Sequence, residues 1–287
     1  MSLTLILTTC VATFLFFYVA AKNKFFEKLF ASQFVFDPKE LDKIVKSAVK
    51  KYPDNFKVDQ VGEMKINHSD ETTVCTLKYD GCKERKWTRE TPDMDGKFNE
   101  PAENPNAIFE LRCEEILRQL HEKYPKYCAD MKSMDFFDSK KMKEQWMFNM
   151  CGGALGQIAI FHFSFTEYIL LYGSPVGAGG FSGRYMMDVY DYIISGHHET
   201  YTPGNIRGLH YTPGDMTFLP RFEACTYRSQ PHTYMMEYGR GFPGVIGGAM
   251  YPFVSALFTT LDFYSFYHQI KVVAGHMYKN WIINRKF

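Results

Sequence analysis

The sequence predicts an α+β fold, in which an N-terminal transmembrane helix precedes a small β-barrel or sandwich with flanking helices and a pair of C-terminal membrane-associated helices. Three observations lead to this prediction. Residues 2–21 carry no charge, residues 186–239 read as short strands broken by turns, and residues 244–283 are apolar and aromatic. Short strands in close succession are typical of barrels and sandwiches.

The composition excludes several classes of protein. The 287 residues are 46% hydrophobic and 23% charged, which excludes disorder for most of the chain. A total of 33 Lys and Arg against 32 Asp and Glu gives a net charge of +1, whereas a general nucleic-acid binder would carry a clear basic excess. The aromatic fraction of 17% indicates an apolar cavity, a membrane surface or both.

Residues 2–21 are predicted to be a transmembrane signal-anchor. Twenty uncharged residues suffice to cross the hydrocarbon core of a bilayer as a helix. A cleaved signal peptide would begin with a basic segment, and here the basic residues Lys22, Lys24 and Lys28 follow the apolar run. We therefore expect a retained anchor rather than a cleaved signal.

The next two segments are a helix and a polar insertion. Residues 35–56 are predicted to hold an amphipathic helix, which Asp37 can cap and Pro38 can begin. Residues 57–106 are polar and rich in turn formers, and the alternating segment TTVCTLKY within them is compatible with a hairpin. The sequon at residues 67–69 would matter only in a luminal protein.

Residues 107–241 are predicted to form the main domain. It begins with an amphipathic helix over residues 107–124. The apolar run at 146–173 is long enough for a second membrane span, but its glycines and polar residues favour the buried core of a folded domain. Four strand-like segments follow: MDVYDYII, DMTFLP, EACTYRS and TYMMEYG.

Residues 242–287 are predicted to form the membrane-associated helices. The segment from Gly244 to Leu261 carries no charge, but Pro252 and three glycines weaken it as a straight span. The aromatic segment that follows is amphipathic. We favour two helices lying in the membrane interface over one span plus a helix. A chain with three spans is a further alternative, which would use the apolar runs near residues 2–21, 151–172 and 244–261.

The sequence predicts neither a metal site nor a cofactor. None of the nine histidines stands in HExxH or a comparable ligand spacing, and the seven cysteines form no CxxC pair. Their odd number argues against a disulfide framework, although one bridge between Cys75 and Cys82 remains open. The glycine-rich segment 174–183 lacks the spacing of a nucleotide-binding loop and is expected to be a flexible turn.

Two carboxylates carry the chemical prediction. Strand alternation places Asp191 on one face with Val189 and Ile193, and it places Glu237 on one face with Met235. If these faces point into a barrel, both acids lie in an apolar cavity, where burial raises a carboxyl pKa. Two neighbouring carboxyls can then differ in protonation, so that one donates a proton and the other accepts one. Ordinary salt bridges on a solvated face are the alternative.

The candidate pocket residues beside these acids are mostly aromatic. Ring faces could line the cavity and stabilise a cation, although such residues are more often plain core. The six candidates are Trp146, Phe161, His162, Glu167, Tyr168 and Tyr185.

From Gln145 to Gly241 the chain resembles the family of fungal C-8 sterol isomerases and the animal sigma (non-opioid) receptor. The resemblance rests on the segments EQWMFNMCGGALGQ, FHFSFTEYILLYG, FSGRY, DVYDYIISG, YTPG and MEYGRG, taken in order. The N-terminal anchor, the segment FVFDPKEL and the aromatic C-terminus match in kind. Residues 57–106 depart from the family.

The resemblance implies a cupin-like β-barrel over residues 107–241, closed by a C-terminal helix pair that lies on the membrane of the endoplasmic reticulum. Assembly as a homotrimer is also implied. The ligand-pairing glutamate of the family falls on Glu237 and its partner aspartate on Asp191, while Tyr168 and Glu167 match a further motif. The lysines after residue 21 would place the main domain in the cytosol, whereas the family implies the lumen.

Two functions remain open within this family. The first is an enzyme that moves a sterol double bond from C8–C9 to C7–C8 by proton transfer between carboxylic acids, with no cofactor. The second is a receptor that binds amine or sterol-like ligands without catalysis. GGALGQ with Ala154, Leu219 and the ending KNWIINRKF resemble the isomerases, whereas MEYGRG and FSGRY resemble the receptor. We expect the isomerase, with Glu237 and Asp191 as its catalytic pair; which of the two is the acid and which is the base stays open at this point.

Overall fold

The computed structural model describes residues 3–56, 58–61, 72–79, 85–90, 107–128 and 144–286. The chain divides into two compact units. The larger unit contains Met1–Lys43 and Met147–Phe287, and the smaller contains Ile44–Trp146. The boundary falls within helix α3, which spans Pro38–Lys51.

The smaller unit contains a helix and a three-stranded sheet. Helix α4 (Ala107–Lys123) matches the predicted amphipathic helix, and it buries an apolar face that includes Ile116 and Leu117. Strands β1 (Val58–Val61), β2 (Thr72–Tyr79) and β3 (Arg85–Glu90) form an antiparallel sheet in that order. The hairpin predicted for TTVCTLKY is therefore confirmed as β2 paired with β3. The sequon and Cys82 lie outside the described residues, so neither the glycosylation nor the disulfide prediction is tested.

The N-terminal segment of the larger unit is helical. Helix α1 spans Leu3–Lys22, and α2 (Phe25–Leu29) and the short helix η1 (Ala31–Gln33) follow it. The end of α1 packs into the folded unit, where Ala21 is buried and its carbonyl oxygen accepts a hydrogen bond from Arg221 at 2.8 Å. Within the described part of the chain, no helix combines the length and the apolar character needed to cross a membrane. The transmembrane assignment of residues 2–21 is therefore not supported.

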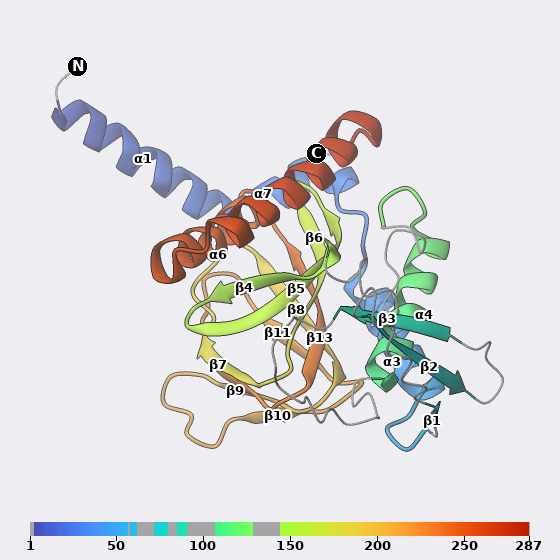
Figure 1. The fold of residues 1–287 in the computed structure, drawn as a ribbon. Coiled ribbons are helices and arrows are strands. Elements are labelled where there is room, and N and C mark those ends of the chain that lie inside the picture. Colours follow the sequence, from blue (N-terminus) through green and yellow to red (C-terminus); the bar gives the residue numbers. More distant parts are fainter. Residues whose placement is uncertain are drawn as a thin grey trace. The chain divides into compact units, whose positions relative to one another are not determined.

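Two antiparallel sheets form the body of the larger unit (Figure 1). The six-stranded sheet has the order β11-β8-β13-β6-β5-β4, and the four-stranded sheet has the order β10-β9-β12-β7. The prediction of a β-barrel is confirmed only in part. The described strands form two separate hydrogen-bonded sheets and do not close into one barrel. The strands of the first sheet are β4 (Met147–Cys151), β5 (Ala154–Phe163), β6 (Glu167–Ser174), β8 (Asp188–Ser195), β11 (Met216–Leu219) and β13 (Thr233–Arg240). Those of the second are β7 (Ala178–Phe181), β9 (His198–Tyr201), β10 (Leu209–Tyr211) and β12 (Thr226–Ser229).

The apolar run at 146–173 forms strands rather than a second membrane span. It contains β4, β5 and most of β6, and all eight residues of β6 are buried. A strand that is covered on both faces has apolar residues at nearly every position. Its sequence therefore resembles that of a membrane-spanning segment.

The glycine-rich segment 174–183 is not simply a flexible turn, because it contains β7. Its glycines allow a close approach to the β4–β5 turn. A Cβ on Gly152 would meet the carbonyl oxygen of Phe181 at 1.7 Å, and Gly152 also has a φ of +58°. Any larger residue there would force the two segments apart.

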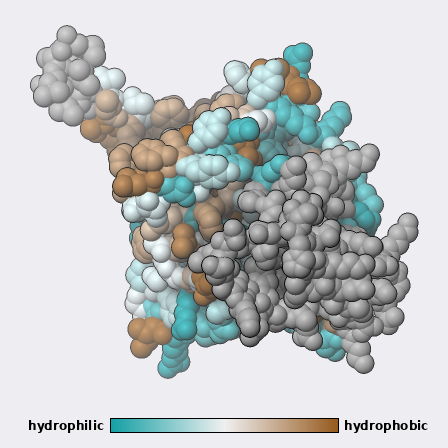
Figure 2. All heavy atoms as spheres, viewed as in Figure 1, coloured by the Kyte–Doolittle hydropathy of each residue, from teal (hydrophilic) through white to brown (hydrophobic). Residues whose placement is uncertain are grey.

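Two C-terminal helices cover one face of the six-stranded sheet (Figure 1). Helix α6 (Gly244–Thr260) contacts β4 and β13, and α7 (Phe263–Tyr278) contacts β4 and β5 before the chain ends in the π-helix η2 (Lys279–Ile283). Large apolar side chains remain exposed on these helices, among them Phe258 and Tyr264. Figure 2 shows hydrophobic residues gathered where α1 and α6 reach the surface.

Candidate functional site

A cavity of about 430 Å³ lies inside the larger unit. Both sheets and the two C-terminal helices contribute to its wall, since His198 comes from β9, Met235 from β13 and Val273 from α7. Most of the lining is apolar or aromatic. These side chains are Ile158, Ile160, Phe163, Tyr168, Leu170, Tyr172, Tyr185, Met187, Val189, Leu209, Tyr211, Phe218, Leu219, Tyr227, Met235 and Val273.

The two predicted carboxylates meet in this cavity. Asp191 on β8 and Glu237 on β13 are direct partners in the antiparallel register, and both line the cavity. Directly opposed residues share a face of the sheet, with their Cβ atoms about 5 Å apart. Strand alternation predicted that each acid shares its face with apolar neighbours, and Val189 and Met235 do line the same cavity. The pairing of the strands is what brings the two acids together.

Each carboxylate has one hydroxyl partner. The Tyr168 hydroxyl donates to Glu237 Oε1 at 2.5 Å, and the Thr217 hydroxyl donates to Asp191 Oδ2 at 3.0 Å. The second oxygen of Asp191, Oδ1, is buried and has no hydrogen-bond partner among the described residues. A buried polar atom without a partner is costly, so this oxygen is a natural contact for a bound ligand.

The cavity changes the proton affinity of both acids. Burial raises the pKa of Asp191 to about 8, and the charge of Glu237 contributes to this rise, while the hydrogen bond from Thr217 acts against it. Burial also raises the pKa of Glu237, and the hydrogen bond from Tyr168 opposes this rise by stabilising the ionised form. Two adjacent carboxyls in an apolar site share one proton more readily than they carry two charges.

Burial and mutual repulsion therefore favour a state in which the two carboxyls share one proton. Such a pair can donate a proton at one atom of a ligand and remove one from an atom nearby. It can also neutralise a single cation, because the remaining negative charge lies in an apolar environment that strengthens the attraction. Aromatic side chains such as Tyr172 and Tyr185 add ring faces around the same space.

Only two of the six predicted pocket residues line this cavity. Tyr168 and Tyr185 do so. Trp146 belongs to the smaller unit and packs against Phe109, with ring centroids 6.3 Å apart. Phe161 is fully buried in the core, at a position where a bulge interrupts the pairing of β5 with β6.

His162 and Glu167 are also buried away from the cavity. The ring of His162 packs edge-on against Phe36, at a centroid distance of 4.8 Å. Glu167 forms an ion pair with Lys286 at 2.8 Å and accepts a hydrogen bond from the Tyr238 hydroxyl at 2.6 Å. Successive residues of a strand point to opposite faces, so Glu167 could not share the cavity with Tyr168.

Sequence reasoning missed Thr217 as a partner of Asp191. The two residues are direct partners in the pairing of β11 with β8. Alternation within DMTFLP places Thr217 on a defined face, but only the register of the two strands identifies which residue it opposes.

Among the described residues, the cluster with metal-ligand spacing is His197, Glu199 and His210, and none of these three lines the cavity.

A family model described as "ERG2 and Sigma1 receptor like protein" matches residues 73–285. The protein erg2 homolog of Dictyostelium discoideum is 34% identical over 174 residues, which are 60% of this chain and 68% of that protein. Sigma non-opioid intracellular receptor 1 of Gallus gallus is 34% identical over 56% of this chain and 68% of its own length. C-8 sterol isomerase ERG2 of Gibberella zeae is 31% identical over 58% of this chain and 65% of its own length.

Solved cupin structures match about a third of this chain. An RmlC-like cupin from Shewanella frigidimarina has a TM-score of 0.30 at 14% identity, and the match covers 34% of this chain and 85% of the cupin. KdgF from Halomonas has a TM-score of 0.28 at 17% identity, covering 33% of this chain and 85% of that protein.

Proposed function

Since this chain belongs to the family of ERG2 and Sigma1 receptor like proteins, we propose that it is a C-8 sterol isomerase. The reaction moves a sterol double bond from C8–C9 to C7–C8. The observation that carries the proposal is the Asp191–Glu237 pair, in which two carboxyls with raised pKa values lie opposite each other and face one apolar cavity. Relatives named C-8 sterol isomerase in three fungi agree with this activity.

In the proposed mechanism Asp191 is the acid and Glu237 is the base. Asp191 gives its proton to C9 of the alkene, which leaves a tertiary cation at C8. Glu237 then removes a proton from C7, and the electron pair of that C–H bond forms the new double bond. The substrate gains one proton and loses one, so no oxidant, reductant or cofactor is required. One proton must pass from Glu237 back to Asp191 before the next turnover.

The cavity would stabilise the positive charge of the C8 cation. During the reaction the C8 cation lies beside negative charge, because Asp191 becomes ionised while Glu237 is still ionised. Charges held in place in an apolar site stabilise a developing cation more strongly than water does. The Tyr168 hydroxyl holds Glu237 Oε1 at 2.5 Å and so positions the base. Ring faces along the wall contribute further cation stabilisation.

The test supplies a Δ8 sterol to the purified protein and follows formation of the Δ7 product. We expect turnover by the wild type and a loss of at least about 100-fold in Asp191→Asn and Glu237→Gln, since general acid–base groups typically contribute factors of this size. Glu122→Gln is the matched control, because Glu122 is an exposed carboxyl on α4. Wild-type turnover no faster than that of Glu237→Gln would refute the proposal.

A second candidate is a sigma-type receptor that binds amines without catalysis. The unpartnered Asp191 Oδ1 and the neighbouring Glu237 carboxyl would suit an ammonium group, which resembles the proposed cation in charge. Four of the relatives are sigma non-opioid receptors at 31–38% identity. Expression in a yeast strain that lacks the isomerase separates the two candidates. Restoration of a normal sterol profile favours the enzyme, and tight amine binding without restoration favours the receptor.

We also propose that the protein acts at the endoplasmic reticulum membrane and assembles as a homotrimer, as the resemblance to the family implies. The exposed rings of α6 and α7 would contact the membrane interface, with Phe258 75% and Tyr264 76% exposed. Co-fractionation with endoplasmic reticulum markers tests the location, and the molecular mass in detergent tests the assembly. A monomer in detergent would contradict the trimer, and recovery in the cytosolic fraction would contradict the location.

A further inference from the structure

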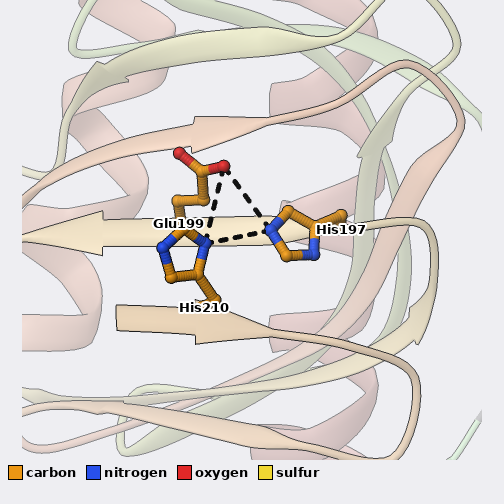
Figure 3. Close-up of side chains that lie close together, drawn as sticks. All are labelled: His197, Glu199 and His210. Atoms are coloured by element: carbon orange, nitrogen blue, oxygen red, sulfur yellow. Dashed lines mark hydrogen bonds and ion pairs between the residues drawn. The ribbon is translucent and has the colours of Figure 1, made fainter. Parts of the chain in front are cut away.

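A cluster of three potential metal ligands lies on the hairpin formed by β9 and β10. Glu199 on β9 pairs directly with His210 on β10, so the two residues share a face of the sheet. His197 directly precedes β9, and its ring lies within 3.5 Å of the Glu199 carboxylate. Figure 3 shows the three side chains converging, with the imidazoles of His197 and His210 and the carboxylate of Glu199 turned toward one another.

The distances between their ligand atoms fit one small ion. His197 Nε2 lies 3.2 Å from His210 Nδ1 and 3.5 Å from Glu199 Oε1, and His210 Nδ1 lies 3.7 Å from the same oxygen. Tetrahedral zinc with bonds of about 2.0–2.1 Å holds its ligand atoms about 3.3–3.4 Å apart. We propose that His197, Glu199 and His210 form a zinc site on the outer surface of the β9–β10 hairpin.

The carboxylate is already oriented for this role. The Tyr201 hydroxyl donates to Glu199 Oε2 at 2.7 Å, which leaves Oε1 facing the two imidazoles. A partner on the second atom of a ligand group fixes its orientation and strengthens metal binding. Two imidazoles and a carboxylate are a ligand set that suits zinc, and the set leaves a fourth position for water.

The exposure of the three side chains and the charge near them determine how tightly the site is expected to bind zinc. The side chains of His197, Glu199 and His210 are 26%, 12% and 55% exposed, so an ion can enter from solvent. Arg228 on β12 is the other direct partner of Glu199, and its positive charge acts on that carboxylate. This charge opposes a cation, so the site binds zinc less tightly than a closed structural centre does.

The proposed zinc site lies on the face of β9 that is opposite to the cavity. Strand alternation turns His198 and Thr200 toward the cavity, which both of them line, and turns Glu199 to the other side. An ion bound by residues of both strands would fasten β9 to β10 and hold this part of the cavity wall. The site depends on the hairpin geometry alone, and it stands whether the cavity serves catalysis or ligand binding.

The experiment titrates metal-free protein, purified without a histidine tag, with Zn²⁺ by calorimetry and with Co²⁺ by visible absorption. We expect one Zn²⁺ per chain, the visible bands of tetrahedral Co²⁺, and a rise in unfolding temperature with zinc concentration. His210→Ala and Glu199→Gln should each weaken zinc binding by at least tenfold. Arg228→Gln should strengthen it several-fold, because a repelling charge is removed.

His268→Ala is the matched control, because it removes a histidine from α7, outside the cluster. It should bind zinc like the wild type. Unchanged zinc stoichiometry and affinity in a variant with both His197→Ala and His210→Ala would overturn the proposal, as would the absence of zinc binding by the wild type. The unfolding temperature of each variant without metal shows whether the fold is intact. The Arg228→Gln variant tests the site by a gain that misfolding could not produce.

Discussion

Replacing Asp191 by asparagine is expected to remove most of the pH dependence of stability that this site creates. The unfolded-state pKa of an aspartate is about 3.9. In the folded protein, burial together with the charge of Glu237 raises the pKa of Asp191 to about 8. The folded state therefore binds this proton more tightly than the unfolded state does.

The sign of the effect follows from this difference. Below about pH 4 the carboxyl of Asp191 is protonated in both the folded and the unfolded state, so its ionisation does not lower the free energy of unfolding. As the pH rises from about 4 to about 8, the unfolded chain has lost the proton and the folded protein still holds it, so stability falls with pH. Four pKa units at about 1.4 kcal/mol each give at most about 6 kcal/mol, and water within the cavity would reduce this figure.

The assay measures the free energy of unfolding in urea at pH values from about 4 to about 8, with circular dichroism as the signal. An asparagine side chain cannot lose a proton in this range, so Asp191→Asn should show a flatter curve than the wild type and a gain in stability that grows with pH. Glu237→Gln should remove the repulsion and so reduce the slope only in part. The reasoning is refuted if the curves of wild type and Asp191→Asn run parallel over the whole range.

Three further predictions concern buried contacts within the larger unit. Lys286→Met should destabilise the protein by about 3–5 kcal/mol in thermal unfolding, because it leaves Glu167 buried without its partner, and adding Glu167→Gln should restore much of the loss. Tyr168→Phe should raise the pKa of Glu237 and move the acid limb of the pH profile of activity or amine binding to higher pH, and an unchanged limb would count against this contact. Gly239→Ala should impair function about as much as Tyr168→Phe, because its Cβ would meet the Tyr168 ring at 2.3 Å, and full activity of this variant would show that the ring can move without consequence.

Several features of the fold could be read from local patterns. The helix over residues 107–124 and the strand segments between residues 186 and 239 were predictable, because periods of 3.6 and 2 are properties of neighbouring residues. The same alternation singled out Asp191 and Glu237 as acids on apolar faces. These predictions needed no knowledge of which strand lies beside which.

Other features of the molecule depend on packing between distant segments. The apolar run at 146–173 is compatible with a span or with strands, and only the coverage of both faces of β6 decides for strands. Glu167 was placed in the pocket because it adjoins Tyr168 in the sequence, whereas its ion pair with Lys286 depends on the far end of the chain. A family-based expectation of a closed barrel gave no information on how the pairing divides into two sheets.

Local sequence patterns were enough to specify the residue types of the site, which are two acids with apolar neighbours on strands of period 2. Which groups face each other depends on the folded arrangement of the strands. The register of β8 with β13 opposes Asp191 to Glu237, and the register of β9 with β10 brings His210 to Glu199. A shift of one residue in either pairing would turn these side chains to opposite faces. Such pairing depends on the packing of the whole unit, and so no local pattern in the chain contains it.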